Sequence, residues 1–268
     1  MELICPVCGG ELNQTERSYR CCRNHSFDIA RQGYVNLLPV QQKHSLNPGD
    51  TREQVLSRRA FLEAGYYAPI ARQIIETARE LGISGEILDA GCGEGYYSAQ
   101  VAAALSASLT GLDISKEAVR CAAAKYKGPL WLTATAAHIP VPDKSADLLM
   151  SLFAITLPEE FARVLKDSGY FFQVLAAQDH LLGLKAIIYP ELKFKEKVSV
   201  PELPGFALVT SVPIRFTFTV EGEQVQHLFS MTPHVFRISK AGAEALAKTE
   251  TLTDTASCVL NVYRKEKL

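Results

Sequence analysis

The segment ILDAGCGEGYYS, residues 87–98, constrains the fold of this chain more than any other. Its glycines Gly91, Gly93 and Gly95 follow a short apolar run and precede a stretch with helical character. Glycine lets the backbone turn sharply there and approach a ligand closely, because a Cβ atom would collide with that ligand. Asp113 ends the next apolar run, where its carboxylate can accept both hydroxyls of a ribose. This order of strand, loop, helix, strand and acidic residue predicts a cofactor-binding α/β sheet.

Strand and helix patterns alternate along the chain. We expect strands at residues 87–90, 108–112, 130–133, 146–152 and 170–176, and helices at residues 51–62, 68–81, 96–105, 116–125 and 159–165. Thr51 and Gln54 have the spacing of a helix capping box. A further helix should follow residue 180, and β-rich segments should lie around residues 206–220 and 256–263. Strands joined by crossover helices predict a parallel, doubly wound sheet, so the expected fold class is α/β.

Four of the seven cysteines lie within the first 22 residues. Cys5 and Cys8 form a C-x2-C pair, and Cys21 precedes His25 at C-x3-H spacing. Three thiolates and one imidazole can surround a zinc ion tetrahedrally, which leaves no open position for catalysis. Cys22 competes for the third position, which we assign to Cys21 because of its spacing to His25. The sequence therefore predicts a structural zinc site, and the alternative is a group of reduced cysteines without metal.

Two classes of cofactor suit a glycine-rich loop of this kind. The dinucleotide fingerprint requires glycine or alanine three residues after the second loop glycine, where this chain has Tyr96. S-adenosylmethionine carries no pyrophosphate and has a cationic sulfonium, so acidic neighbours such as Asp89 and Glu94 are acceptable beside it. We therefore expect S-adenosylmethionine. Asp89 could instead brace the loop, and Asp113 is expected to bind the ribose.

These motifs resemble the bacterial 23S ribosomal RNA (guanine-N1-)-methyltransferases over nearly the whole chain. The resemblance is carried by CPVC (5–8), FDIARQGYVNLLPV (27–40), SRRAFLEAGYY (57–67), LDAGCGEGYY (88–97), HLLGLK (180–185) and MTP (231–233). It implies a zinc-binding domain and a Rossmann-like class I methyltransferase domain, and from the residue pattern we expect the first over residues 1–35, a linker with helices over 36–82, and the second over 83–268. It also implies S-adenosylmethionine-dependent methylation of N1 of one guanine in a 23S rRNA hairpin loop, carried out by a homodimer.

The resemblance further implies roles for single residues. The positions of Cys5, Cys8, Cys21 and His25 hold zinc in that family, and those of Tyr67, Gly93, Glu94 and His180 lie around the methyl donor. From the residues alone, Tyr67 would be a packed aromatic and His180 a helix cap. Guanine N1 must lose a proton, and candidates for a general base are His138, Asp179 and His180. For His138 and Asp179, solvation of a loop is the alternative.

The chain departs from the family pattern in three places. Ile155, Asp167-Ser168 and Ala176-Ala177 stand where that pattern has proline-containing turns. Two of these changes follow predicted strands, at the sheet edge where ligands bind. They leave two alternatives open, namely a small-molecule methyltransferase with a retained zinc appendage and a non-catalytic RNA-binding protein.

The net charge of -1 does not exclude an RNA partner, because basic residues cluster locally. The clusters contain Arg17, Arg20, Arg23 and Arg31 in the zinc segment, and Lys185, Lys193, Lys195 and Lys197 further along the chain. Either cluster could also be a solvated face. The chain lacks a secretory signal pattern and an apolar stretch of membrane-spanning length. We expect a cytoplasmic protein whose partner is 23S rRNA, with no membrane or DNA partner.

Overall fold

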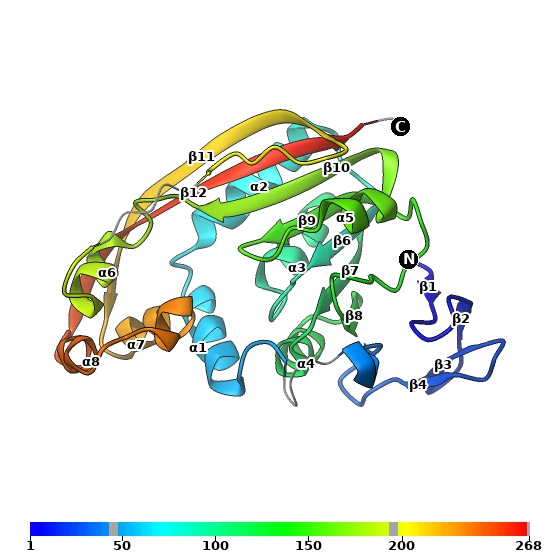
Figure 1. Ribbon diagram of the computed structural model, residues 1–268, viewed down its shortest axis with the longest axis horizontal. Coiled ribbons are helices and arrows are strands. Elements are labelled where there is room, and N and C mark those ends of the chain that lie inside the picture. Colours follow the sequence, from blue (N-terminus) through cyan, green and yellow to red (C-terminus); the bar gives the residue numbers. More distant parts are fainter. Residues whose placement is uncertain (43–47, 193–197, 267–268) are drawn as a thin grey trace.

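The computed structural model describes residues 1–42, 48–192 and 198–266. A large sheet occupies the centre of the molecule, a small sheet lies at the N-terminal end, and a group of helices lies at the opposite end (Figure 1). Three lysines of the predicted basic clusters, Lys193, Lys195 and Lys197, lie outside the described residues, as do residues 43–47 of the predicted linker.

The large sheet has eight strands in the order β11-β12-β10-β9-β6-β7-β8-β5. The strands are β5 (Tyr34–Asn36), β6 (Glu86–Ala90), β7 (Ser108–Asp113), β8 (Leu130–Thr133), β9 (Ala146–Leu152), β10 (Leu165–Ala176), β11 (Phe206–Glu221) and β12 (Thr251–Lys265). Strands β5 to β10 run parallel, whereas β12 is antiparallel to both β10 and β11. The predicted α/β sheet is thus confirmed, and β12, which runs against its two neighbours, makes it mixed rather than wholly parallel.

The helices agree closely with the expected ones in the first two-thirds of the chain. They are α1 (Arg52–Glu63), α2 (Ala68–Glu80), α3 (Tyr96–Leu105), α4 (Lys116–Lys125), α5 (Pro158–Val164), α6 (Leu182–Ile188), α7 (Glu223–Ser230) and α8 (Lys240–Ala247), with short 3-10 turns η1 (Val40–Gln42) and η2 (Pro233–Phe236). The predicted capping box is confirmed, because the Thr51 side chain accepts from the Gln54 amide and the Gln54 side chain accepts from the Thr51 amide. Leu165 begins β10 instead of ending a helix, which corrects the expected boundary. The sequence did not predict α7, α8 or β5.

The small sheet is an antiparallel meander of β1 (Leu3–Ile4), β2 (Glu11–Gln14), β3 (Ser18–Cys21) and β4 (Ser26–Asp28). It is attached to the loop between β8 and β9, since the Ile4 amide donates to the Pro140 carbonyl at 3.0 Å. The chain then enters the large sheet at Tyr34, where β5 pairs in parallel with β8. This strand crosses the predicted domain boundary at residue 35, and that boundary stays a prediction.

Apolar side chains cover both faces of the large sheet. Neighbouring residues in a strand point to opposite faces, so Ile87 and Met150 belong to one buried cluster while Leu88 and Leu149 belong to the other. The first cluster includes side chains of α2, α3 and α4, and the second includes side chains of α5, β1 and β2. The small sheet therefore shares a hydrophobic core with the large domain.

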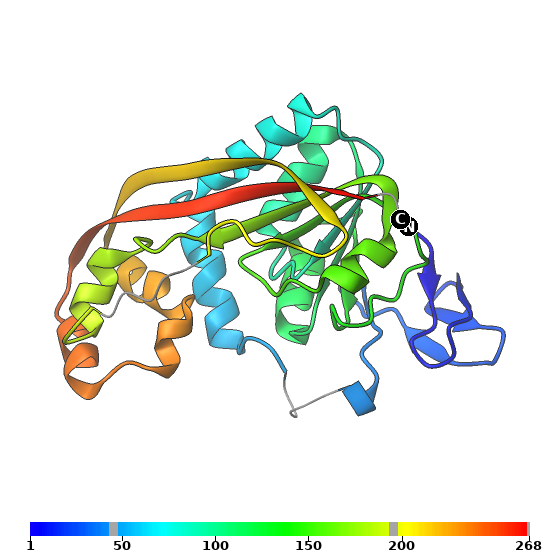
Figure 2. The same ribbon diagram turned by 45° about the horizontal axis from the view of Figure 1, so that its top comes forward.

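The antiparallel pair β11 and β12 extends beyond the rest of the sheet, and α6, α7 and α8 gather around its far end (Figures 1 and 2). Helix α1 contacts α7 on one side and α3 and α4 on the other. It therefore lies between this helical end and the loops that follow β6 and β7. Among the described residues, no helix is long and apolar enough to cross a membrane.

Candidate zinc centre and cofactor site

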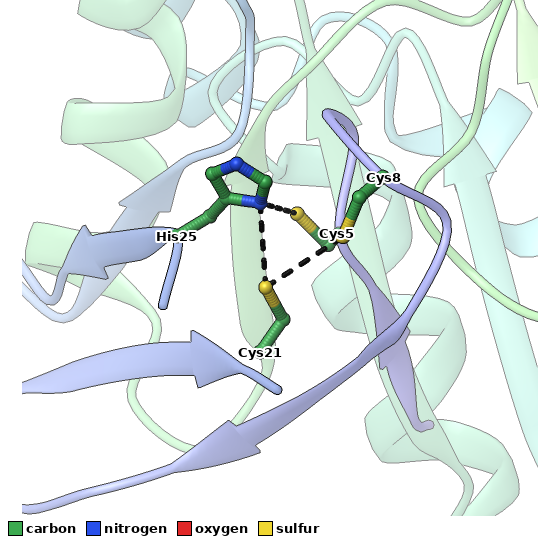
Figure 3. A group of neighbouring side chains, drawn as sticks. All are labelled: Cys5, Cys8, Cys21 and His25. Carbon is green, nitrogen blue, oxygen red and sulfur yellow. Dashed lines mark hydrogen bonds between the residues drawn. The ribbon is translucent and has the colours of Figure 1, made fainter. Parts of the chain in front are cut away.

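The four predicted zinc ligands meet at one end of the small sheet. Cys5 and Cys8 lie on the turn between β1 and β2, Cys21 ends β3, and His25 precedes β4. Their sulfur and nitrogen atoms all lie within 4.8 Å of one another (Figure 3). Cys22 is exposed and lies outside this group. The structure thus brings together the set with Cys21 in the third position.

Three distances within the group match a tetrahedral zinc site. With Zn–S bonds of about 2.3 Å and Zn–N bonds of about 2.0–2.1 Å, tetrahedral ligands stand roughly 3.8 Å apart for two sulfurs and roughly 3.5 Å apart for a sulfur and a nitrogen. The Cys8 and Cys21 sulfurs are 3.7 Å apart, and His25 Nδ1 lies 3.5 Å from Cys5 Sγ and 3.4 Å from Cys21 Sγ. Protein atoms fill all four positions, so this is a structural site.

The ionisation of Cys21 also suits a metal ligand. Desolvation acts to raise the pKa of this thiol, but backbone hydrogen bonds at His25 and Arg23 and hydrogen bonds from the Cys8 and Cys5 thiols lower it to about 6, whereas burial raises the pKa of Cys5. The Cys21 thiol is therefore largely thiolate at neutral pH, and the thiolate is the form that binds zinc.

The glycine-rich loop follows β6 and leads into α3, as the sequence predicts. Gly91, Gly93 and Gly95 all have positive φ, at 94°, 56° and 81°. A Cβ on Gly91 would stand 2.6 Å from Ala154 Cβ, and one on Gly95 would stand 2.6 Å from the Trp131 ring. At Gly93 the nearest atom would be an Arg58 nitrogen at 3.8 Å. Gly91 and Gly95 are therefore needed for packing, whereas Gly93 borders the space in front of the loop.

Asp113 stands at the end of β7 and holds the loop in place. Its Oδ2 accepts from the Gly93 amide at 3.0 Å, and its Oδ1 accepts from the Ser115 amide at 2.7 Å. Burial raises the pKa of this carboxyl, although the two amide hydrogen bonds act in the opposite direction. Each carboxylate oxygen keeps a further lone pair, so a ribose role is compatible with this bracing role.

Two other carboxyl groups at the loop are buried without full pairing. Asp89 and Glu94 are 2% and 5% exposed, and Asp89 Oδ1 and Glu94 Oε2 have no hydrogen-bond partner among the described residues. Burial raises the pKa of each carboxyl to about 7. A buried polar atom without a partner is costly, so this site needs a ligand that donates hydrogen bonds or carries positive charge. The sulfonium and amino groups of S-adenosylmethionine fit that need.

Arg58 is a site residue to which the sequence analysis gave no role. It projects from α1 toward the loop, with Nη2 at 2.5 Å from Asp50 Oδ2 and Nη1 at 3.9 Å from Glu94 Oε2. Burial opposes its charge, but these carboxylates raise the pKa of the guanidinium. The sequence contains a signal for this role, because Arg58 lies on the apolar face of its helix, three residues after Val55 and four before Leu62, both of which are buried on α1. A cation on the apolar face of a helix commonly has a partner.

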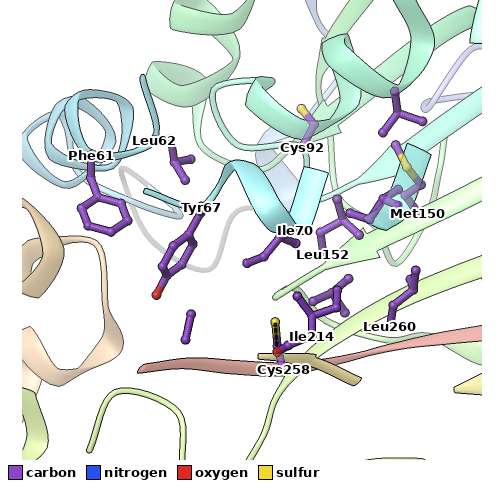
Figure 4. Close-up of a cluster of buried hydrophobic side chains, with 14 of the residues drawn as sticks. Phe61, Leu62, Tyr67, Ile70, Cys92, Met150, Leu152, Ile214, Cys258 and Leu260 are labelled. Carbon is purple, nitrogen blue, oxygen red and sulfur yellow. Dashed lines mark hydrogen bonds between the residues drawn. The ribbon is translucent and has the colours of Figure 1, made fainter. Parts of the chain in front are cut away.

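Tyr67 and His180 meet beside the hydrophobic core, although 113 residues separate them in the sequence. Tyr67 precedes α2 and points among buried side chains (Figure 4), with its hydroxyl 3.4 Å from His180 Nε2. His180 Nδ1 accepts from the Ser257 amide at 3.1 Å. An accepting Nδ1 places the ring proton on Nε2, so His180 is neutral and donates to Tyr67 Oη.

The other two candidates for a general base lie in different surroundings. His138 is exposed and lines a cleft of about 580 Å³ together with Ile4, Cys5 and other residues of the zinc segment. Asp179 is ion-paired with Arg215 on β11. Hydrogen bonds from Ser257 and from Arg215 lower the pKa of its carboxyl. A carboxylate that is held ionised by such partners is a weak proton acceptor at neutral pH, which disfavours Asp179.

Two segments of the chain match known families. Residues 3–46 match a zinc-ribbon family described as "RlmA, N-terminal", and residues 88–173 match a family described as "Methyltransferase domain". The first segment contains the four clustered ligands, and the second contains the glycine-rich loop and Asp113. These matches confirm the predicted class I methyltransferase fold with an N-terminal zinc ribbon. They also confirm S-adenosylmethionine and structural zinc as the cofactors of such a chain.

Three relatives align with most of this chain and with most of their own length. The chain is 32% identical to the 23S rRNA (guanine(748)-N(1))-methyltransferase of Streptomyces fradiae, in a match that covers 86% of this chain and 84% of that protein. It is 36% identical to a protein of Micromonospora griseorubida whose name provisionally assigns it a 23S rRNA (guanine-N(1)-)-methyltransferase activity, with 98% and 97% covered. A Bacillus subtilis protein, YxjB, has the same provisional name and is 28% identical, with 85% of each chain covered.

Proposed function

Since this chain belongs to the family of 23S rRNA guanine-N1 methyltransferases, we propose that it transfers the methyl group of S-adenosylmethionine to N1 of a guanine in 23S rRNA. The observation that carries the proposal is the joint presence of both functional parts in one chain. The zinc-ribbon match and the methyltransferase match occur together, and relatives at 32% and 36% identity align over most of their own length.

The residues around the glycine-rich loop would bind the donor in three parts. Asp113 would accept the ribose hydroxyls, and Gly93 would allow the donor to approach the backbone. Glu94 and Asp89 would face its cationic amino and sulfonium groups. Their low exposure and the carboxylate oxygens without a hydrogen-bond partner in the described part of the chain support this contact. Arg58 would pair with the carboxylate of the methionine portion, since its guanidinium already stands beside Gly93. When bound, S-adenosylmethionine supplies an activated methyl group.

The target nitrogen imposes its own requirement on the RNA. Guanine N1 donates the central hydrogen bond of a base pair, so an unpaired or flipped guanine is needed. A hairpin loop meets this requirement with the least unpairing cost. Because the donor is already activated, alignment of N1 with the methyl carbon would provide most of the rate enhancement.

Tyr67 and His180 would stabilise one wall of the site. The hydrogen bond that His180 receives from Ser257 fixes its ring, and His180 in turn fixes the Tyr67 hydroxyl. Action in the cytoplasm, a homodimer and RNA contact through the arginines of the zinc segment are further parts of the proposal.

Primer extension on ribosomal RNA tests this function in cells. A methyl on guanine N1 blocks base pairing and stops reverse transcriptase. We expect one new stop in 23S rRNA from cells that express the protein, and none from cells that express Asp113→Ala at the same level. A stop that persists in cells without the gene, or identical profiles in all three strains, would contradict the proposal.

A further inference from the structure

We propose that Phe153 is the platform on which the target guanine stacks beside the methyl donor. This inference rests on the proposed function and assigns to one residue the positioning of the base. Phe153 follows the last residue of β9, at the carboxyl edge of the parallel strands. Ligands of open α/β sheets bind at this edge.

The backbone of Phe153 has a conformation that a bulky residue rarely adopts. Its φ is 56°, in the left-handed region, and it is the one aromatic residue among five non-glycine residues with positive φ in the described part of the chain. Hydrogen bonds on both sides hold this conformation. The Phe153 amide donates to the Val174 carbonyl at 2.9 Å, and Ser151 Oγ donates to the Ile155 carbonyl at 2.9 Å. Glycine would adopt this backbone without strain, so the presence of an aromatic ring on a strained backbone points to a use for the ring.

The same turn exposes two large apolar side chains to solvent. Phe153 is 41% exposed and Ile155 is 61% exposed. Phenylalanine is usually buried, and here the left-handed turn directs it outward instead. Phe153 and Ile155 therefore form a small apolar surface at the end of β9.

This surface lies directly beside the predicted donor site. Ala154, between the two exposed residues, packs so closely against Gly91 that a Cβ on that glycine would stand 2.6 Å from Ala154 Cβ. The Phe153 ring lies 6.3 Å from the His180 ring, at an angle of 35°. The His180 ring lies 6.2 Å from the Tyr67 ring. Three rings thus form a continuous wall that begins at the core and ends at the exposed face of Phe153.

An unpaired nucleobase is the occupant that this surface favours. An unpaired base loses its stacking neighbours, and an aromatic side chain replaces them at a gain of about 1–3 kcal/mol per base. Hydrogen bonds hold the strained backbone and therefore the ring in one place. A guanine stacked on the ring would then have a fixed position relative to the methyl group of the donor. Stacking recognises a flat ring without reading its edge, which makes Phe153 a positioning residue and leaves the choice of guanine to other groups.

Methyl transfer by purified variants to stripped 23S rRNA tests the inference. Phe153→Leu keeps an apolar side chain of similar size but removes the aromatic face. We expect kcat/KM for the RNA to fall about 5- to 150-fold, while the Kd for S-adenosylmethionine changes by less than about twofold. Phe153→Trp should recover most of the activity that Phe153→Leu loses. The matched control is Phe236→Ala, which removes an aromatic side chain that is 76% exposed on η2, and its kcat/KM should equal that of the wild type.

Two further measurements separate stacking from a merely structural role. Phe153→Gly and Phe153→Ala remove the same ring, but only glycine adopts this backbone without strain, so the Tm of Phe153→Gly should be equal to or above that of Phe153→Ala even though RNA methylation falls in both. The fluorescence of the tryptophan introduced by Phe153→Trp should be quenched when stripped 23S rRNA is added, whereas Trp131 is buried and serves as background in the wild type. Wild-type kcat/KM in Phe153→Leu would overturn the platform and leave the proposed function intact. A wild-type protein that binds the donor but methylates no RNA would overturn both.

Discussion

Alanine substitutions at the loop glycines should separate folding stability from donor binding. Gly95 has φ 81°, and an alanine Cβ there would meet the Trp131 ring at 2.6 Å and Ala122 Cβ at 3.2 Å. The left-handed backbone costs an alanine about 1–2 kcal/mol, and forcing a methyl into a packed region costs about 1–3 kcal/mol more. Gly95→Ala should therefore lower the free energy of unfolding by about 2–5 kcal/mol. For a chain of this size that corresponds to a fall in Tm of roughly 4–20 °C.

Gly93→Ala should give the opposite pattern. Its φ of 56° imposes the same backbone cost of about 1–2 kcal/mol, but the nearest atom to the new Cβ would be an Arg58 nitrogen at 3.8 Å. The methyl would occupy space that we assign to the donor. We expect a small fall in Tm and a rise of about tenfold or more in the Kd for S-adenosylmethionine, because close approach of the donor to the backbone is lost.

Gly82→Ala is the matched control for backbone strain. Gly82 has φ 63°, with nothing within 4 Å of the new Cβ, and it follows α2 away from the loop. Urea unfolding and isothermal titration calorimetry of the three variants provide the assay. If Gly95→Ala is no less stable than Gly82→Ala, the packing argument is wrong. If Gly93→Ala binds the donor as tightly as Gly82→Ala does, Gly93 does not border the donor.

Three other predictions follow from the site. Cys5→Ser should abolish stoichiometric zinc in the purified protein and lower its Tm, because the small sheet shares a core with the large domain; mass spectrometry of the metal content and calorimetry check this, and full zinc retention would refute the ligand set. Burial raises the pKa of Asp89 and of Glu94 to about 7 from 3.8 and 4.5, so their contribution to stability falls as pH rises from about 4 to 7, where the unfolded chain ionises first. The affinity for S-adenosylmethionine relative to that for S-adenosylhomocysteine, whose sulfur is uncharged, should rise between pH 6 and 8 as both carboxyls ionise, and a constant ratio in titration calorimetry would contradict a contact between either carboxylate and the sulfonium. Arg58→Met should weaken S-adenosylhomocysteine binding about tenfold but leave 5′-methylthioadenosine, which lacks the methionine carboxylate, unaffected, and equal losses would show that Arg58 only supports the loop.

The parts of the fold that depend on local pattern could be predicted from the sequence. Helices Tyr96–Leu105 and Lys116–Lys125 and strand Ala146–Leu152 have the expected bounds, because apolar periodicity and flanking caps or turns define each one locally. The zinc ligands were also accessible, since Cys5, Cys8, Cys21 and His25 have a spacing that follows from tetrahedral geometry.

The remaining elements depend on distant contacts. β5 has three residues and pairs with β8, almost a hundred residues later, so no local period reveals it. Helices α7 and α8 have eight residues each. Helix α7 packs on α1, and helix α8 packs on α6. Such short helices are marginal on propensity alone.

The candidate site shows the same division. The roles of Gly93 and Gly95 look equivalent in the sequence. Only the structure shows that Gly95 packs against the Trp131 ring, whereas Gly93 has no close neighbour in the part of the chain that the structure describes. Asp179 follows a strand at the sheet edge, as a catalytic residue would, but its ion pair with Arg215 depends on the register of β11. The exposure of Phe153 likewise results from a left-handed turn, which the surrounding apolar sequence does not predict.

The most direct test of the central claim is nucleoside analysis of RNA methylated in vitro. Purified protein is incubated with stripped 23S rRNA and S-adenosylmethionine that carries a labelled methyl group, and the RNA is then digested to nucleosides and separated by mass spectrometry. The expected result is that the label appears in 1-methylguanosine and is lost with Asp113→Ala. Label in a different nucleoside, or no label from a protein that binds the donor, would contradict it.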